Sequence, residues 1–194
     1  MKNETIYDKI KSQVSEKRWK HIEGAAETAV RLAAVYGVSA HKAETAALFH
    51  DYCRSFTKEE LNGYVDQIGL DEIYLDNVAL AHGKAAARVM ATHFGIHDED
   101  ILNAVSYHTT GRPGMSMLEK IIYIADAIEP GRNYEGVDDI RKLAFIDIDE
   151  ACRKVLEKSI DFVKSKGEIL HTDTLKALHY LNEQKAGKNK EGKI

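Results

Sequence analysis

Apolar residues recur every three to four positions along nearly the whole chain. Ala25, Ala29 and Leu32 form one such stripe, and Gly37 stands where the helix that carries it is expected to stop. No segment keeps a two-residue alternation of apolar and polar side chains, and we find no hairpin signal. The pattern therefore predicts an all-α protein, a bundle of about eight to ten helices.

Polar residues mark where several of these helices begin. In a capping box, a Ser or Thr side chain accepts a hydrogen bond from the backbone three residues on, and a Glu there returns it. Such pairs are Thr57 with Glu60 and Ser116 with Glu119. Asp147 with Glu150 gives a similar start to a helix that is expected to run to about Lys166.

Two helices are predicted to be buried, because their apolar residues leave almost no polar face. They cover Glu44–Tyr52 and Ser116–Glu129, and Pro130-Gly131 ends the second. The last helix is expected over about Thr172–Gln184. We therefore predict one domain over residues 1–185, followed by a flexible Gly- and Lys-rich tail over 186–194.

The composition excludes several classes of protein. The 194 residues carry a net charge of −4, so the chain is not a generally basic nucleic-acid-binding protein. No apolar run reaches the roughly 18 residues that span a bilayer, and the N-terminus has no apolar signal core. The two cysteines, Cys53 and Cys152, suit a reducing compartment. We expect a cytoplasmic protein with neither a membrane nor a nucleic-acid polymer as its partner.

Four ionisable side chains fall where apolar faces are expected. His21 lies on the stripe of Ala25, His50 and Asp51 close the run AALFHD, and Asp126 interrupts IIYIADAI. A single histidine in such a place is usually structural, and a single aspartate is often a helix cap or an ion-pair partner. Burying carboxylates without partners is costly, so the four together are better explained by a cation between them. Their nitrogen and oxygen atoms suit zinc, iron or manganese.

Two further histidines have more open interpretations. His82 is expected to begin a helix in LAHGKAAARVM, and its alternative role is that of an exposed helix start. His108 ends a helix and is followed by Thr109 and a glycine-containing turn. Its alternative role is a favourable charge at the helix C-terminus.

These residues give the chain a resemblance to the HD superfamily of metal-dependent phosphohydrolases. The signature of that superfamily is a His, a His-Asp pair and a distant Asp on different helices of an all-α bundle. It is matched here by His21, His50-Asp51 and Asp126. Longer pieces, including AALFHDYCR, YHTTGRPGMSMLEKIIYIADAIEPGR and ILHTDTLKAL, are similar to the YqeK family of symmetrical diadenosine tetraphosphatases. The second acidic pair of guanosine tetraphosphate hydrolases is missing, as are a Walker loop and a Nudix box.

The resemblance implies a single-domain HD helical bundle with a metal held by His21, His50, Asp51 and Asp126. It favours iron, although the ligand types also accept zinc or manganese, and Asp51 is a candidate to bridge to a second ion. His82 and His108 are then either ligands of that second ion or donors to phosphate, and we favour the second role. The candidate catalytic residues are Asp51, His82 and His108.

The resemblance also implies a nucleotide-binding surface. Arg18 and Arg132 are expected to bind phosphate, and the alternative for each is a surface arginine. The run ILHTDT resembles a nucleoside-contacting segment and also fits a helix start capped by Thr172 or Asp173. The predicted nucleotide-binding residues are Arg18, Asp51, His82, His108, Thr109, Asp126, Arg132, Ile169, Leu170, His171, Thr172, Asp173 and Thr174. Lys84 is left without a role.

The implied substrate is a dinucleoside polyphosphate. Diadenosine tetraphosphate is expected to yield two ADP, a guanosine analogue would yield GDP, and the family implies a homodimer. One alternative is another HD-type nucleotide phosphohydrolase, such as a nucleotidase or a dNTP hydrolase. A second is a non-catalytic nucleotide-sensing module.

Overall fold

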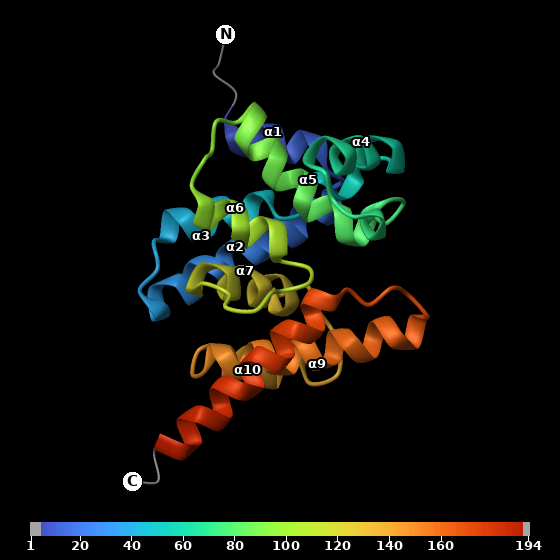
Figure 1. Ribbon diagram of the computed structural model, residues 1–194. Helices are drawn as coiled ribbons and strands as arrows, with labels where there is room; N and C mark the ends of the chain where they lie inside the picture. The colour runs from blue at the N-terminus through green and yellow to red at the C-terminus, as the bar shows by residue number, and fades with distance from the viewer. Residues whose placement is uncertain (1–4, 192–194) are drawn as a thin grey trace.

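The computed structural model of the protein describes residues 5–191, with side chains up to Gly187. All regular structure within this range is helical, as the spacing of apolar residues predicts (Figure 1). The α-helices are α1 Ile6–Gln13, α2 Glu16–Tyr36, α3 Ala40–Phe49, α4 Lys58–Ile68, α5 Val78–His93, α6 Glu99–Tyr107, α7 Met117–Ile128, α8 Val137–Ala144, α9 Ile148–Lys166 and α10 Thr172–Glu191. Two short 3-10 helices, η1 Tyr52–Ser55 and η2 Glu72–Tyr74, lie between them.

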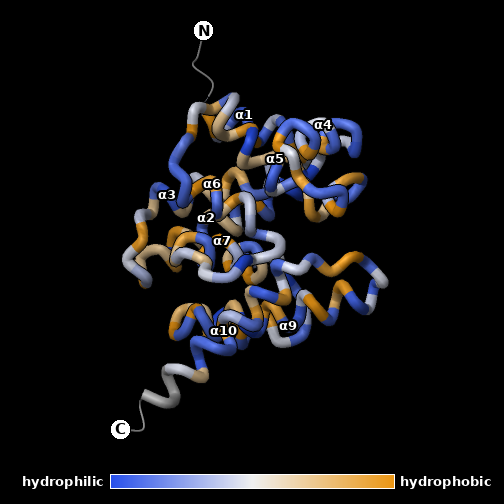
Figure 2. Tube along the Cα trace, in the orientation of Figure 1, coloured by the Kyte–Doolittle hydropathy of each residue, from blue (hydrophilic) through white to orange (hydrophobic). Residues whose placement is uncertain are grey.

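The helices form a single domain built around α2 and α7. α2 packs against α3 and α7, while α5 packs against α4 and α6. On its other side α7 packs against α9, and α10 turns back along α9 (Figure 1). Hydrophobic residues alternate with hydrophilic ones along most of these helices, so each has one face to bury (Figure 2).

Helix α7 is buried nearly all round, as its sequence predicts. Ile121, Ile122 and Ile124 point to different sides of the helix, and each is at most 1% exposed. The helix can be surrounded because α2, α6 and α9 all contact it. α7 therefore holds Asp126 in a fixed place between α2, α6 and α9.

The predicted helix starts are confirmed. Thr57 and Ser116 both form complete capping boxes, and the Asp147 side chain accepts a hydrogen bond from the backbone of Glu150. Gly37 ends α2 in the left-handed conformation that glycine adopts at low cost.

The predicted boundaries of three helices are wrong; the first of them, α3, already begins at Ala40. α3 ends at Phe49 rather than at Tyr52, because the chain turns at Asp51 into η1. α5 begins at Val78, capped by Asn77, so His82 lies inside the helix rather than at its start.

The third error concerns the end of the chain. α10 continues to Glu191, past the predicted end near Gln184. The predicted flexible tail therefore begins within this helix, and 192–194 lie outside the described residues. Among the described helices, none combines the length and apolar character needed to cross a membrane.

Candidate metal centre and phosphate site

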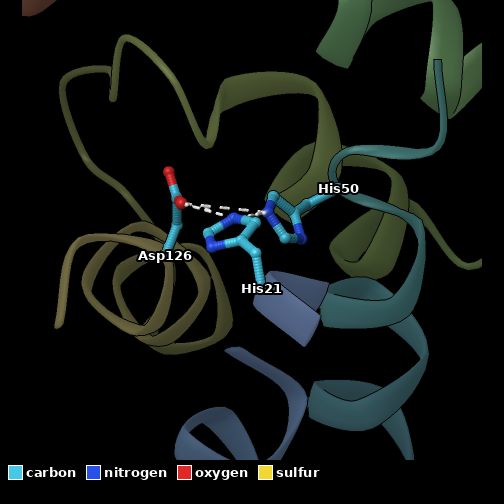
Figure 3. Close-up of side chains that lie close together, drawn as sticks. All are labelled: His21, His50 and Asp126. Atoms are coloured by element: carbon cyan, nitrogen blue, oxygen red, sulfur yellow. Dashed lines mark hydrogen bonds and ion pairs between the residues drawn. The ribbon is translucent and has the colours of Figure 1, made fainter. Parts of the chain in front are cut away.

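The four residues of the His, His-Asp, Asp pattern meet at one point, although they come from three separate parts of the chain. His21 projects from α2, His50 follows the end of α3, and Asp126 lies on α7 (Figure 3). Asp51 comes directly after His50 in the chain. His21 Nε2 is 3.1 Å from His50 Nε2, 3.1 Å from Asp126 Oδ1 and 3.4 Å from Asp51 Oδ2. The predicted grouping is therefore present in space.

The histidine rings are fixed by their other nitrogen. His50 Nδ1 donates to the carbonyl of Ala47 at 2.6 Å, within the last turn of α3. His21 Nδ1 donates to Glu129 Oε1 at 3.1 Å. Because a carbonyl or carboxylate oxygen only accepts, each Nδ1 carries the hydrogen, and each neutral ring presents a lone pair at Nε2.

This arrangement fits a metal cation. Two Nε2 lone pairs 3.1 Å apart repel one another unless a proton or a metal cation lies between them. His21, His50 and Asp126 each offer a ligand atom within 4.8 Å of the others, and His50, Asp51 and His108 form a second such group. A mixed set of imidazole nitrogens and carboxylate oxygens suits zinc, iron and similar divalent ions.

The electrostatics of the centre keep the carboxylates ionised. Burial opposes the charge on Asp51, but His50, His21 and His82 outweigh it and hold the pKa of Asp51 well below its ordinary value. Burial likewise opposes the charge on Asp126, and His21 and Arg132 lower its pKa. Burial lowers the pKa of His50, so this ring stays neutral and available as a ligand.

His21 is the ring of the centre that attracts a proton when no metal is held. Burial disfavours the charged ring, but hydrogen bonds to Asp126, Asp51 and Glu129 raise its pKa to about 9. A metal cation and this proton compete for the same nitrogen, so metal binding releases a proton.

Glu129 is a functional candidate that the sequence reasoning missed. Its side chain is 6% exposed, and it fixes the orientation of the His21 ring. The chain leaves room for it, because a Cβ on Gly24 would lie 2.8 Å from Glu129 Oε2. The only sequence signal was its position one turn beyond Asp126 on the same apolar helix.

His82 contacts the Asp51 oxygen that His21 does not, and it pairs with His108. His82 Nε2 is 3.1 Å from Asp51 Oδ1 and 3.0 Å from His108 Nε2. Their Nδ1 atoms donate to the carbonyls of Val78 and Val105, at 2.9 and 2.7 Å. Burial and the neighbouring rings of His82 and His50 lower the pKa of His108 to about 3, so His108 is neutral and its Nε2 accepts rather than donates.

The two predicted phosphate-binding arginines lie at the edge of the centre. Arg18 Nη1 contacts Asp51 Oδ2 at 2.5 Å, and Arg132 forms an ion pair with Asp126. Their side chains are 33% and 40% exposed, so both remain within reach of a ligand. Thr109 Oγ1 lies 3.2 Å from His108 Nε2, which places it in the same cluster.

Arg141 of α8 holds the turn that carries Arg132. Its guanidinium donates to the carbonyls of Ile128, Glu129 and Arg132 at 2.7–2.9 Å. These carbonyls lie where α7 ends and have no partner inside the helix. The turn after α7 is therefore fixed by a neighbouring helix and not only by Pro130.

The segment 169–174 lies at the start of α10. His171 is buried, and its Nδ1 accepts a hydrogen bond from the backbone of Asp173, so the helix is capped by His171 rather than by Thr172 or Asp173. Thr174 is buried too, while Ile169 and Thr172 are exposed and Leu170 is half-buried. No interaction joins this segment to the four metal-ligand candidates within the described part of the chain.

Comparison with known proteins gives consistent matches. Residues 18–131 match the family described as HD domain. Curated relatives named bis(5'-nucleosyl)-tetraphosphatase, symmetrical, occur in Bacillus subtilis and Staphylococcus aureus. The first is 40% identical over 89% of this chain and 93% of the relative, and the second is 37% identical over 89% and 90%. A crystal structure from Clostridium acetobutylicum, described as that of a predicted HD superfamily hydrolase involved in NAD metabolism, is 42% identical. It covers 94% of this chain and 100% of its own, with a TM-score of 0.88.

Proposed function

The chain belongs to the HD domain family, and we propose that it is a metal-dependent hydrolase that cleaves diadenosine tetraphosphate symmetrically into two ADP. The observation that carries this proposal is the meeting of His21, His50, Asp51 and Asp126 at one point. The named relatives, at 37–40% identity over 89% of the chain, support the substrate.

We propose that the four ligands hold one or two divalent ions, with iron as the first candidate. A bound divalent ion supplies an activated water as nucleophile and polarises a phosphoryl oxygen. Asp51 contacts both His21 and His82, so it connects the proposed metal ligands with the His82–His108 pair.

The remaining residues of the site are assigned by their charge and geometry. Arg18 and Arg132, now paired with carboxylates, are proposed to turn their guanidinium groups onto phosphate oxygens when the polyphosphate enters. His82, whose Nε2 lies 3.1 Å from Asp51 Oδ1 and 3.0 Å from His108 Nε2, is proposed to form a hydrogen bond with an oxygen of the leaving phosphate.

The nucleoside is proposed to lie against the start of α10, where Ile169, Leu170, His171, Thr172, Asp173 and Thr174 are predicted to contact it. His171 keeps the hydrogen on Nε2 because its Nδ1 accepts from the backbone, so the ring offers one donor. Thr109 is proposed to contact the phosphate beside His108.

Product analysis tests the activity. The purified protein, reconstituted separately with iron, manganese and zinc, is incubated with diadenosine tetraphosphate, and the products are separated by chromatography. We expect ADP alone. AMP with ATP, or no turnover with any metal, would contradict the proposal, and dNTPs and nucleoside monophosphates in parallel reactions test the alternative substrates.

The metal site is tested by Asp51→Ala, compared with the wild type by elemental analysis and by turnover. We expect loss of turnover and of metal, since Asp51 contacts three of the histidines, His21, His50 and His82. A variant that kept both its metal and its activity would show that the ligand assignment is wrong.

Two further properties are proposals. A cytoplasmic location is supported by the free, buried thiols of Cys53 and Cys152, which suit a reducing compartment. A homodimer follows from the family resemblance, and sedimentation of the purified protein tests it.

A further inference from the structure

Lys84 is a buried lysine that the site described above does not use. It lies on α5, two residues after His82, and only 9% of it is exposed. Lysine is rarely buried to this extent without a partner. Within the described residues, the Lys84 ammonium has neither a hydrogen bond nor an ion pair, and its contact is with the ring of Tyr107, 3.3 Å from Nζ to the centroid.

The surroundings of Lys84 leave its charge uncompensated. Arg112 lies over the same Tyr107 ring at 4.6 Å, but the guanidinium of Arg112 is already held by two bonds to Glu119. Burial lowers the pKa of Lys84 to about 8, and Asp173 opposes this shift through space without contacting Lys84. Lys84 and Arg112 thus place two cations at the Tyr107 ring, and the Glu119 carboxylate pairs with one of them, Arg112. The ammonium of Lys84 can therefore take a further anion as its partner.

The position of Lys84 lies between the two parts of the proposed substrate site. On one side, Gly83 brings α5 against His108, since a Cβ there would be 3.0 Å from the His108 ring. On the other side, the His171 ring lies 5.3 Å from the ring of Tyr74 in η2, which packs against α5; burial lowers the pKa of His171, and the charge of Lys84 lowers it further. A nucleotide reaching from the metal ligands to the start of α10 would pass this ammonium.

We propose that Lys84 binds the α-phosphate, the phosphate next to the nucleoside, and that this phosphate is the missing partner of its ammonium. The inference rests on the proposed function, which puts the reacting phosphate at the metal and the nucleoside at residues 169–174. In symmetrical cleavage the bond that breaks joins the two inner phosphates, so the α-phosphate does not react. Lys84 is accordingly a substrate-binding residue whose contact is the same before and during the reaction.

Lys84→Met tests the proposal, because methionine keeps the length of the side chain and removes the charge. We expect KM for diadenosine tetraphosphate to rise about tenfold, the effect of one lost charge-assisted hydrogen bond, with kcat nearly unchanged. AMP binding, measured by calorimetry, weakens by the same factor, while adenosine binding is unaffected. Lys84→Arg, which keeps the charge, retains most of the AMP affinity.

Stability separates this role from a structural one. A buried charge without a carboxylate partner does not stabilise the fold, so Tm of Lys84→Met is expected to equal or exceed that of the wild type. The matched control is Lys120→Met, since Lys120 is 16% exposed and paired with Asp149 at 2.7 Å. There we expect a lower Tm and an unchanged KM.

Each outcome decides one question. Unchanged AMP affinity in Lys84→Met overturns the inference, as does a lowered Tm with unchanged KM, which would make the Tyr107 contact structural. Lys84→Gln, which is also neutral, repeats the AMP titration if the methionine variant does not fold. Absence of turnover by the wild type rejects the proposed function, and the AMP titration still decides whether Lys84 binds phosphate.

Discussion

At the scale of the residue, the site is defined by which nitrogen of each ring is occupied. His50, His82 and His108 all donate from Nδ1 to a carbonyl three or four residues earlier in the chain, so the backbone of the same helix sets the direction of each ring. His21 is the exception, because its Nδ1 donates to the Glu129 side chain on another helix. The orientation of three rings is therefore set by contacts within their own part of the chain. The orientation of His21 is set by a contact between two helices.

Glu129→Gln is predicted to weaken metal binding by about 10–100-fold, as expected for loss of a carboxylate partner of a ligating histidine. The amide oxygen can still accept a hydrogen bond from His21, but it lacks the negative charge that makes the His21 ring a stronger ligand. Metal titration with a competing chelator measures the effect. Glu135→Gln, at an exposed residue beyond the site, is the control and should leave the affinity unchanged.

Residue-scale reasoning explains what could be predicted from the sequence. His21, His50, Asp51 and Asp126 were found because a charge on an apolar helix face is conspicuous. Glu129 was not found, because an acidic residue beside Pro130 fits an exposed helix end equally well. The spacing of residues along a helix indicates which of them share a face. It does not indicate which face of another helix packs against that face.

At the scale of the element, the close approach of α5 and α6 places His82 against His108. Gly83 permits this approach, since a Cβ there would lie 2.9 Å from the Val105 carbonyl and 3.0 Å from the His108 ring. A helix around Gly83 is predicted from the sequence, but its predicted start at His82 is wrong. Asn77, which caps the helix, has no Glu or Gln three residues later to complete a capping box.

Gly83→Ala is predicted to lower the free energy of unfolding by about 1–3 kcal/mol, the usual effect of overpacking. It is also predicted to reduce turnover, because His108 must move. Thermal unfolding and steady-state kinetics measure the two effects. Gly63→Ala is the matched control, since Gly63 lies in the middle of α4 with open space at its Cβ, and there alanine should stabilise by up to about 1 kcal/mol.

At the scale of the whole molecule, the four proposed metal ligands join α2, α3 and α7, which together form the middle of the fold. An ion bound there contacts side chains from residues 21 to 126, and it is expected to bind the native state in preference to the unfolded one. The net charge of −4 is no obstacle to a polyanionic substrate, because Arg18 and Arg132 lie at the centre and Lys84 is proposed to add a third positive charge.

Metal binding is therefore predicted to stabilise the whole domain. Free metal at a hundred times its dissociation constant should add about 2.7 kcal/mol to the free energy of unfolding. Calorimetric melts of the metal-free and reconstituted protein measure the shift in Tm, and Asp51→Ala should show none of it. A wild-type Tm that does not change when the metal is added would place the ion outside this centre.

The order of the site along the chain has a consequence for how the protein is made. All four proposed metal ligands precede Arg132, whereas the segment proposed to hold the nucleoside follows α9. Because a ribosome releases the N-terminal part first, the ligands emerge from it before residues 169–174 exist. We expect the growing chain to meet its metal before it is able to hold a nucleotide, whose phosphates would otherwise compete for the same ion.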